Sequence, residues 1–78
     1  MRFYFHIASA RELFEDAEGA DLPNVAAAKM HALEAARDVM RTRFARYGPD
    51  WSGWSVRVRD DAGADVLMVP FAEAEPRG

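Results

Sequence analysis

The sequence contains no cysteine, which excludes a disulfide framework, a thiol nucleophile and a thiolate metal site. No apolar run approaches the roughly 18 residues of a transmembrane helix, and the N-terminal segment MRFYFHIA lacks the pattern of a secretory signal peptide. No glycine-rich phosphate loop occurs, and no serine lies in a recognisable nucleophile motif. We therefore expect a non-catalytic, cytoplasmic protein that uses no cofactor and contacts no membrane.

What the chain does have is the composition of one small folded domain. Of its 78 residues, 50% are hydrophobic, 12% aromatic and 29% charged, which is ordinary for a folded chain. A domain of this size buries only about 60% of the surface that its unfolded chain exposes, so its core is thin. We predict a single domain over residues 1–72, followed by a disordered C-terminal tail over residues 73–78.

One long helix is predicted in the middle of the chain. Residues 25–47 are rich in alanine and contain neither glycine nor proline, as is typical of strong helix formers. Asn24 is a suitable N-cap, and Gly48-Pro49 is a stop signal. The apolar positions that fit a 3.6-residue period are Val25, Ala28, Ala32, Leu33, Ala36, Val39, Met40, Phe44 and Tyr47.

Two segments before this helix and two after it indicate strands. Residues 2–8 and 54–59 alternate apolar with polar side chains, a weaker strand is expected around residues 12–16, and a fourth over residues 66–71. Gly19 suits a turn with positive φ, and residues 60–65 have the composition of a hairpin turn. The predicted fold class is α+β, with the order β-β-α-β-β: a four-stranded antiparallel sheet with one long helix packed on one face.

The helix covers only one face of such a sheet. The uncovered face would carry Tyr4, His6, Ser55, Arg57 and Arg59, together with either Val66 and Met68 or Leu67 and Val69. Mixed, partly apolar faces of this kind often pair with another chain. We therefore predict a protein-interaction or regulatory domain that forms a homodimer through the open face or an edge strand, or binds a heterologous protein. The candidate interaction residues are Tyr4, His6, Trp51, Arg57 and Arg59, with Trp51 as an exposed anchor and Trp54 assigned to the core under the helix.

A cluster of arginines supports an alternative function. Residues 37–59 carry six arginines against two aspartates, a net charge of +4, between residues 1–36 at −3 and residues 60–78 at −4. A nucleic-acid-associated regulator would place Arg37, Arg41, Arg46, Arg57 and Arg59 at phosphates. The acidic balance of the whole chain, at −3, and the acids available for pairing on the same helix favour protein contacts instead.

The histidines and the acids before the helix lack metal-site spacing. His6 lies on a strand, and His31 lies on the polar helix face one turn from Glu34, where the two can pair. The acids Glu15, Asp16, Glu18 and Asp21 do not follow an EF-hand pattern. We predict no metal site: His6 hydrogen-bonds across the sheet, and the acids lie in a solvated strand end that leads to the helix.

Several short motifs, taken in order, resemble a known family. They are Arg2-Phe3-Tyr4-Phe5-His6, then Glu18-Gly19 and Leu22-Pro23 before the helix, then Gly53-Trp54-Ser55-Val56, Asp60 or Asp61 with Gly63, and Val69-Pro70-Phe71. In this combination the chain resembles the short bacterial proteins classified as domain of unknown function 6894, over about residues 2–72. It departs from that pattern in a longer, more polar start to the second strand, at residues 9–12. The resemblance implies no particular activity.

Overall fold

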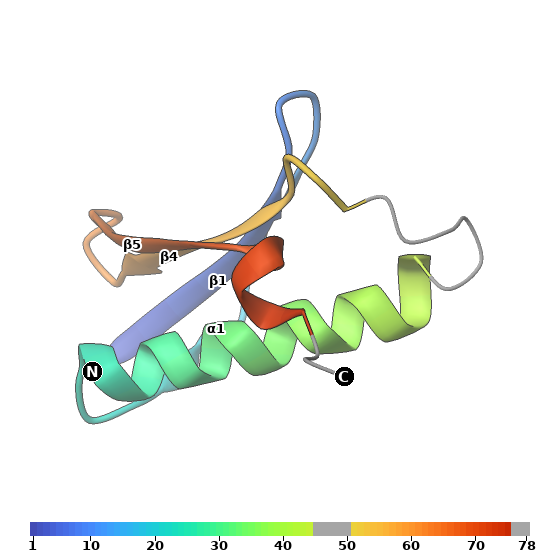
Figure 1. The fold of residues 1–78 in the computed structure, drawn as a ribbon. Helices are drawn as coiled ribbons and strands as arrows, with labels where there is room; N and C mark the ends of the chain where they lie inside the picture. Colours follow the sequence, from blue (N-terminus) through green and yellow to red (C-terminus); the bar gives the residue numbers. More distant parts are fainter. Residues whose placement is uncertain (45–50, 76–78) are drawn as a thin grey trace.

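A computed structural model of the chain describes residues 1–44 and 51–75 (Figure 1). Its elements in chain order are β1 (Arg2–Ala8), β2 (Leu13–Phe14), β3 (Ala20–Asp21), α1 (Val25–Val39), a π-helical turn η1 (Met40–Phe44), β4 (Ser55–Asp60), β5 (Asp65–Pro70) and a 3₁₀ turn η2 (Phe71–Ala74). The predicted α+β class is confirmed: one long helix packs against one face of an antiparallel sheet. Among these residues, no helix is both long and apolar enough to cross a membrane.

The sheet is built around two long central strands. Its strand order is β2-β1-β4-β5, and β3 pairs with β1 beside β2. β1 and β4 pair over six residues, from Phe3 opposite Asp60 to Ala8 opposite Ser55. β5 pairs with β4 through a register shift at Val58 and Arg59. Among the described residues β5 has no second neighbouring strand, and Pro70, which has no N–H to donate to one, suits this edge position.

The first hairpin differs from the prediction. The strand expected over residues 12–16 is reduced to Leu13–Phe14, and a second two-residue strand, β3, pairs with the start of β1. The cause is local, because Asp16 Oδ1 accepts hydrogen bonds from the backbone N–H groups of Glu18 and Gly19. Such a turn, closed by an aspartate side chain, competes with a continuing strand.

Helix α1 begins at the predicted position. Asn24 Oδ1 accepts a hydrogen bond from Ala27 N–H at 2.8 Å, which confirms the N-cap. The residues that face the sheet are alanines, and these small side chains let the helix approach the strands closely. Val25 is 45% exposed, contrary to its predicted place on the buried face. The expected helix end at Tyr47 and the Gly48-Pro49 stop signal lie outside the described residues.

The core lies between the sheet and α1 (Figure 1). The sheet contributes Phe3, Phe5, Val56, Val58 and Val69, and the helical segments contribute Ala28, Ala32, Ala36 and Met40. The side chains of β1 and β4 that face this core alternate with side chains on the opposite side of the sheet, as the sequence pattern predicts. The opposite side, which α1 does not cover, is called the open face below.

The chain after β5 turns back towards the helix. The fourth strand ends at Pro70 rather than Phe71, and η2 follows it and packs against α1. Phe71 and Ala74 are fully buried, and Arg37 Nε donates a hydrogen bond to the Ala74 carbonyl at 3.3 Å. Residues 73–75 are thus part of the folded domain, because the short turn returns apolar side chains to the core. Residues 76–78 lie outside the described part of the chain.

Candidate interaction surface

The open face is made of two rows of side chains that run across β1, β4 and β5. Residues directly opposite one another in an antiparallel sheet share a face. The pairing registers give the rows His6–Arg57–Met68 and Tyr4–Arg59–Asp65. The sheet therefore brings together four of the five predicted interaction residues and adds Met68 and Asp65. Neither face assignment left open for β5 holds in full: Met68 lies on the open face, but the register shift leaves Val66 packed against the core with Leu67 and Val69.

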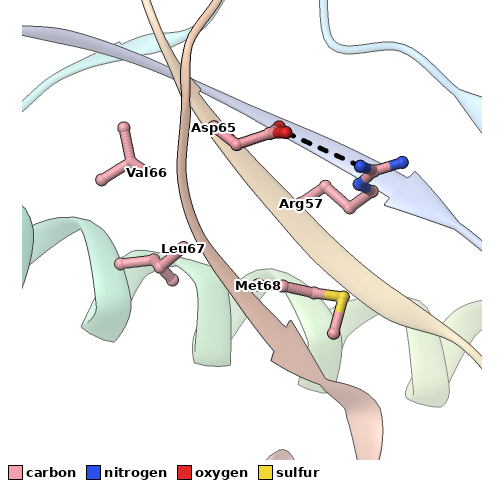
Figure 2. A pocket seen from close by; sticks show the side chains of 5 residues that line it. All are labelled: Arg57, Asp65, Val66, Leu67 and Met68. Atoms are coloured by element: carbon pink, nitrogen blue, oxygen red, sulfur yellow. Dashed lines mark ion pairs between the residues drawn. The ribbon is translucent and has the colours of Figure 1, made fainter.

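Asp65 neutralises part of the positive charge on this face. Its carboxylate accepts a hydrogen bond from Arg59 Nε at 2.9 Å and lies 3.8 Å from Arg57 Nη2. Figure 2 shows Arg57, Asp65 and Met68 on one side of the β5 backbone, while Val66 and Leu67 point to the other side. The arginine side chains are about 40% exposed, and partly exposed ion pairs contribute only about 0–1 kcal/mol each. The pairs therefore orient the arginines more than they stabilise the fold.

Met68 is the most prominent apolar group of the open face. It is 60% exposed at the sheet edge. Beside it lies a hollow of about 220 Å³, lined by Arg57, Asp65, Val66, Leu67 and Met68 (Figure 2). An exposed methionine is flexible and polarizable, and such side chains are common on binding surfaces.

The outer edge of β5 offers few hydrogen-bonding groups. Phe71 N–H donates to the Trp54 carbonyl at 3.0 Å, which marks residues 54 and 71 as a hydrogen-bonded position. Bonded and non-bonded positions alternate along an antiparallel pair, so Val69 bonds to β4, while the N–H and C=O groups of Met68 point away from it. Pro70 points outward too but has no N–H. Within residues 1–44 and 51–75, no strand pairs with this outer edge.

The opposite edge of the sheet is formed by short strands and a loop. β2 pairs with the end of β1, and β3 pairs with its start. Between them, Asp16 Oδ2 accepts the Phe5 N–H at 3.1 Å, and Asp16 N–H donates to His6 Nδ1 at 3.0 Å. His6 therefore bonds to the loop beside β1 rather than across the sheet to β4. The loop takes the place of a continuous strand along the centre of β1.

These contacts shift the titration of Asp16. Partial burial acts to raise the pKa of its carboxyl group, but hydrogen bonds from the N–H groups of Gly19, Phe5 and Glu18 outweigh it and lower the pKa below its ordinary value. The sequence identified Asp16 only as one of four solvated acids. The Asp-x-Glu-Gly spacing of residues 16–19 is the signal that indicates an aspartate-closed turn.

Gly19 occupies the tightest position of this loop. Its φ is +71°, and a Cβ atom there would lie 2.8 Å from the Phe3 carbonyl oxygen and 3.0 Å from the Tyr4 ring. We expect Gly19→Ala to lower the free energy of unfolding by about 2 kcal/mol, from backbone strain and this clash, measured by thermal or urea unfolding. Gly63→Ala is the matched control, because Gly63 also has positive φ, +83°, with nothing within 4 Å. Equal losses in the two variants would contradict the close packing of Gly19 on β1.

The two tryptophans and His31 lie in surroundings that differ from the prediction. Trp51 is half-buried rather than an exposed anchor, and its Nε1 donates to Glu75 Oε1 at 2.6 Å. Trp54 is at the margin of the core, with its ring 6.1 Å from that of Phe14. His31 is half-buried and packs on the Phe5 ring at 4.4 Å, because the alanines beside it bring α1 close to β1.

The structure separates the arginines of the nucleic-acid hypothesis. Arg57 and Arg59 lie on the open face, whereas Arg37 and Arg41 come from α1 and η1, which pack on the other side of the sheet. Arg46 lies outside the described residues. The described arginines therefore form no single basic surface. Among residues 1–44 and 51–75, no group of three or more histidine, aspartate or glutamate side chains is placed to hold a metal ion.

Comparison with known proteins gives one match. The family described as "Domain of unknown function (DUF6894)" matches residues 2–72, which is most of the chain. No curated protein and no solved structure matches.

Proposed function

The chain belongs to the DUF6894 family, and from the surface described above we propose that it is a small non-catalytic interaction domain that pairs with a second copy of itself. The observation that carries the proposal is the exposure of Met68, at 60%, where the open face meets the outer edge of β5, which pairs with no strand of the described residues. A chain of 78 residues has a thin core. Burying exposed apolar surface against a second copy adds to that core.

The charges on the open face are compatible with the approach of a second copy of the chain. Asp65 lies between Arg57 and Arg59, so the face carries both signs close together rather than a large field of one sign. A second copy meets little net repulsion there, whereas a polyanion would gain little from arginines that already have a carboxylate partner. This supports protein contact over nucleic-acid contact.

The molar mass in solution tests this proposal. Light scattering behind size exclusion, at low and high protein concentration, should show a mass that rises from 8.7 kDa towards twice that value. Raising the salt concentration should leave the dimer in place, since an apolar contact is screened little. A dimer that dissociates steeply with added salt would mean that the arginines hold it together, and would contradict the apolar contact.

Two methionine variants test whether Met68 lies in the contact between the two chains. Met68→Lys places two like charges at the proposed contact and should weaken dimerisation about tenfold or more. Met30→Lys is the matched control, because Met30 is 58% exposed but lies on α1, away from the open face. A protein that stays monomeric at every concentration, or equal effects of the two variants, would overturn the proposal.

A further inference from the structure

Self-association through the β5 edge would follow from an asymmetry between the two edges of the sheet. On the β1 side the edge is short and interrupted, because it consists of two strands of two residues each, β2 and β3, with the Asp16 carboxylate bonded to β1 between them. The β5 side has no neighbouring strand among the described residues. Two long open edges would allow repeated pairing into filaments, whereas a sheet with one long edge and one of two-residue strands favours a single pairing. The partner that such an edge fits is a second copy arranged about a twofold axis, which gives a closed dimer.

The segment of β5 that is available for pairing with another chain is short and is limited at both ends. The register shift opposite Val58 and Arg59 interrupts the strand near Asp65, and Pro70 removes a donor at the other end. Bulges and prolines at sheet edges limit pairing with other chains. The segment between them, residues 66–69, carries no charged side chain, so two copies can approach along it without repulsion.

From these observations we infer that two chains pair antiparallel along β5, with Met68 of each chain opposite Met68 of the other. This inference rests on the proposed function and specifies its contact. In an antiparallel pair, residues at a bonded position exchange two N–H···O=C bonds. Met68 presents both its N–H and its C=O outward, so this register satisfies both groups in both chains.

Side chains and charges agree with the same register. The two Met68 side chains lie on the same face of the joined sheet and cover one another, which buries the apolar group most exposed on the open face. Each Asp65 is three residues from the axis, so the two carboxylates are about 20 Å apart at 3.4 Å per residue. That separation exceeds the screening length of about 8 Å at physiological salt, and the pair adds no like-charge contact.

Disulfide trapping tests the register directly, and the absence of cysteine from the chain makes single-cysteine variants unambiguous. At a bonded antiparallel position the two Cα atoms are about 5.5 Å apart, which lies within the range that a disulfide spans. Under mild oxidation, Met68→Cys should form a reducible covalent dimer about tenfold faster than Met30→Cys, because pairing raises the effective concentration of its thiol. The exposed positions of both residues make the variants compatible with folding, which circular dichroism checks.

The outcomes separate this inference from the proposed function. If the wild-type chain dimerises but Met68→Cys is trapped no faster than Met30→Cys, the β5 register is wrong and self-association stands. If the wild-type chain is monomeric and both variants are trapped equally slowly, self-association fails as well. Rapid trapping of Met68→Cys alone, in a protein whose wild type is dimeric, supports both.

Discussion

Replacing Phe71 with alanine is expected to lower the free energy of unfolding by about 3–5 kcal/mol, the usual cost of removing a fully buried aromatic ring. Phe71 has no solvent exposure, and its ring lies 6.4 Å from that of Trp54. It starts η2, which packs against α1, so its ring joins the end of β5 to the helix. A domain of this size has a total stability of only about 4–12 kcal/mol. The variant should therefore lose a large share of its stability and unfold at a clearly lower urea concentration than the wild-type chain.

Urea unfolding followed by circular dichroism measures this loss. Phe14→Ala is the matched control, because Phe14 also lies near the Trp54 ring but is 41% exposed. We expect the control to lose clearly less stability, since partly exposed side chains bury less apolar area. If both variants lost the same small amount, η2 would not be part of the cooperative core, as the predicted disorder of residues 73–78 would imply.

The second large effect is expected at Asp16, where one carboxylate accepts three backbone hydrogen bonds. Asp16→Ala leaves these N–H groups without their acceptor and should cost about 2–3 kcal/mol. The stability is lost mainly in the loop beside β1, where the Phe5 N–H loses its acceptor. Amide hydrogen exchange at Phe5 should therefore accelerate more than exchange in β4. Unchanged protection at Phe5 would contradict the role assigned to the carboxylate.

The same carboxylate makes stability depend on pH in a defined direction. Because the pKa of Asp16 is lower in the folded chain than its unfolded value of about 3.9, its stabilisation is complete above that pH and is lost as the pH falls through the folded value. The wild-type chain should lose stability below about pH 4, and Asp16→Asn should lose less over the same interval. The matched control is Glu15→Gln, which removes the charge of an exposed neighbouring carboxylate; an equal effect of the two variants would contradict the role of Asp16.

Local patterns in the sequence predict most of the fold. Alternation predicts β1 and β4, and Asn24 marks the start of α1, because these signals depend on residues close together in the chain. The strands also predict which side chains share the open face, once the helix is assigned to the other side. The family resemblance over about residues 2–72 is confirmed as well.

Features that depend on contacts between residues far apart in the chain cannot be predicted from such local patterns. The Asp16 carboxylate bonds to Phe5, eleven positions away in the chain, and nothing near Asp16 marks that partner. The return of Ala74 to the core depends on where α1 lies, and the separation of the arginines depends on which side of the sheet the helix covers. Met68 could be assigned to the open face only when the register of β5 against β4 was known.

Self-association of the chain is decided by its molar mass in solution. Sedimentation equilibrium of the wild-type chain over a wide range of protein concentration, with no tag or partner present, measures that mass. We predict a reversible shift from one chain of 8.7 kDa to two chains, with no larger species, because β5 is the only strand longer than two residues that lacks a second neighbour among the described residues. A single chain at every concentration, or a series of ever larger assemblies, would contradict it.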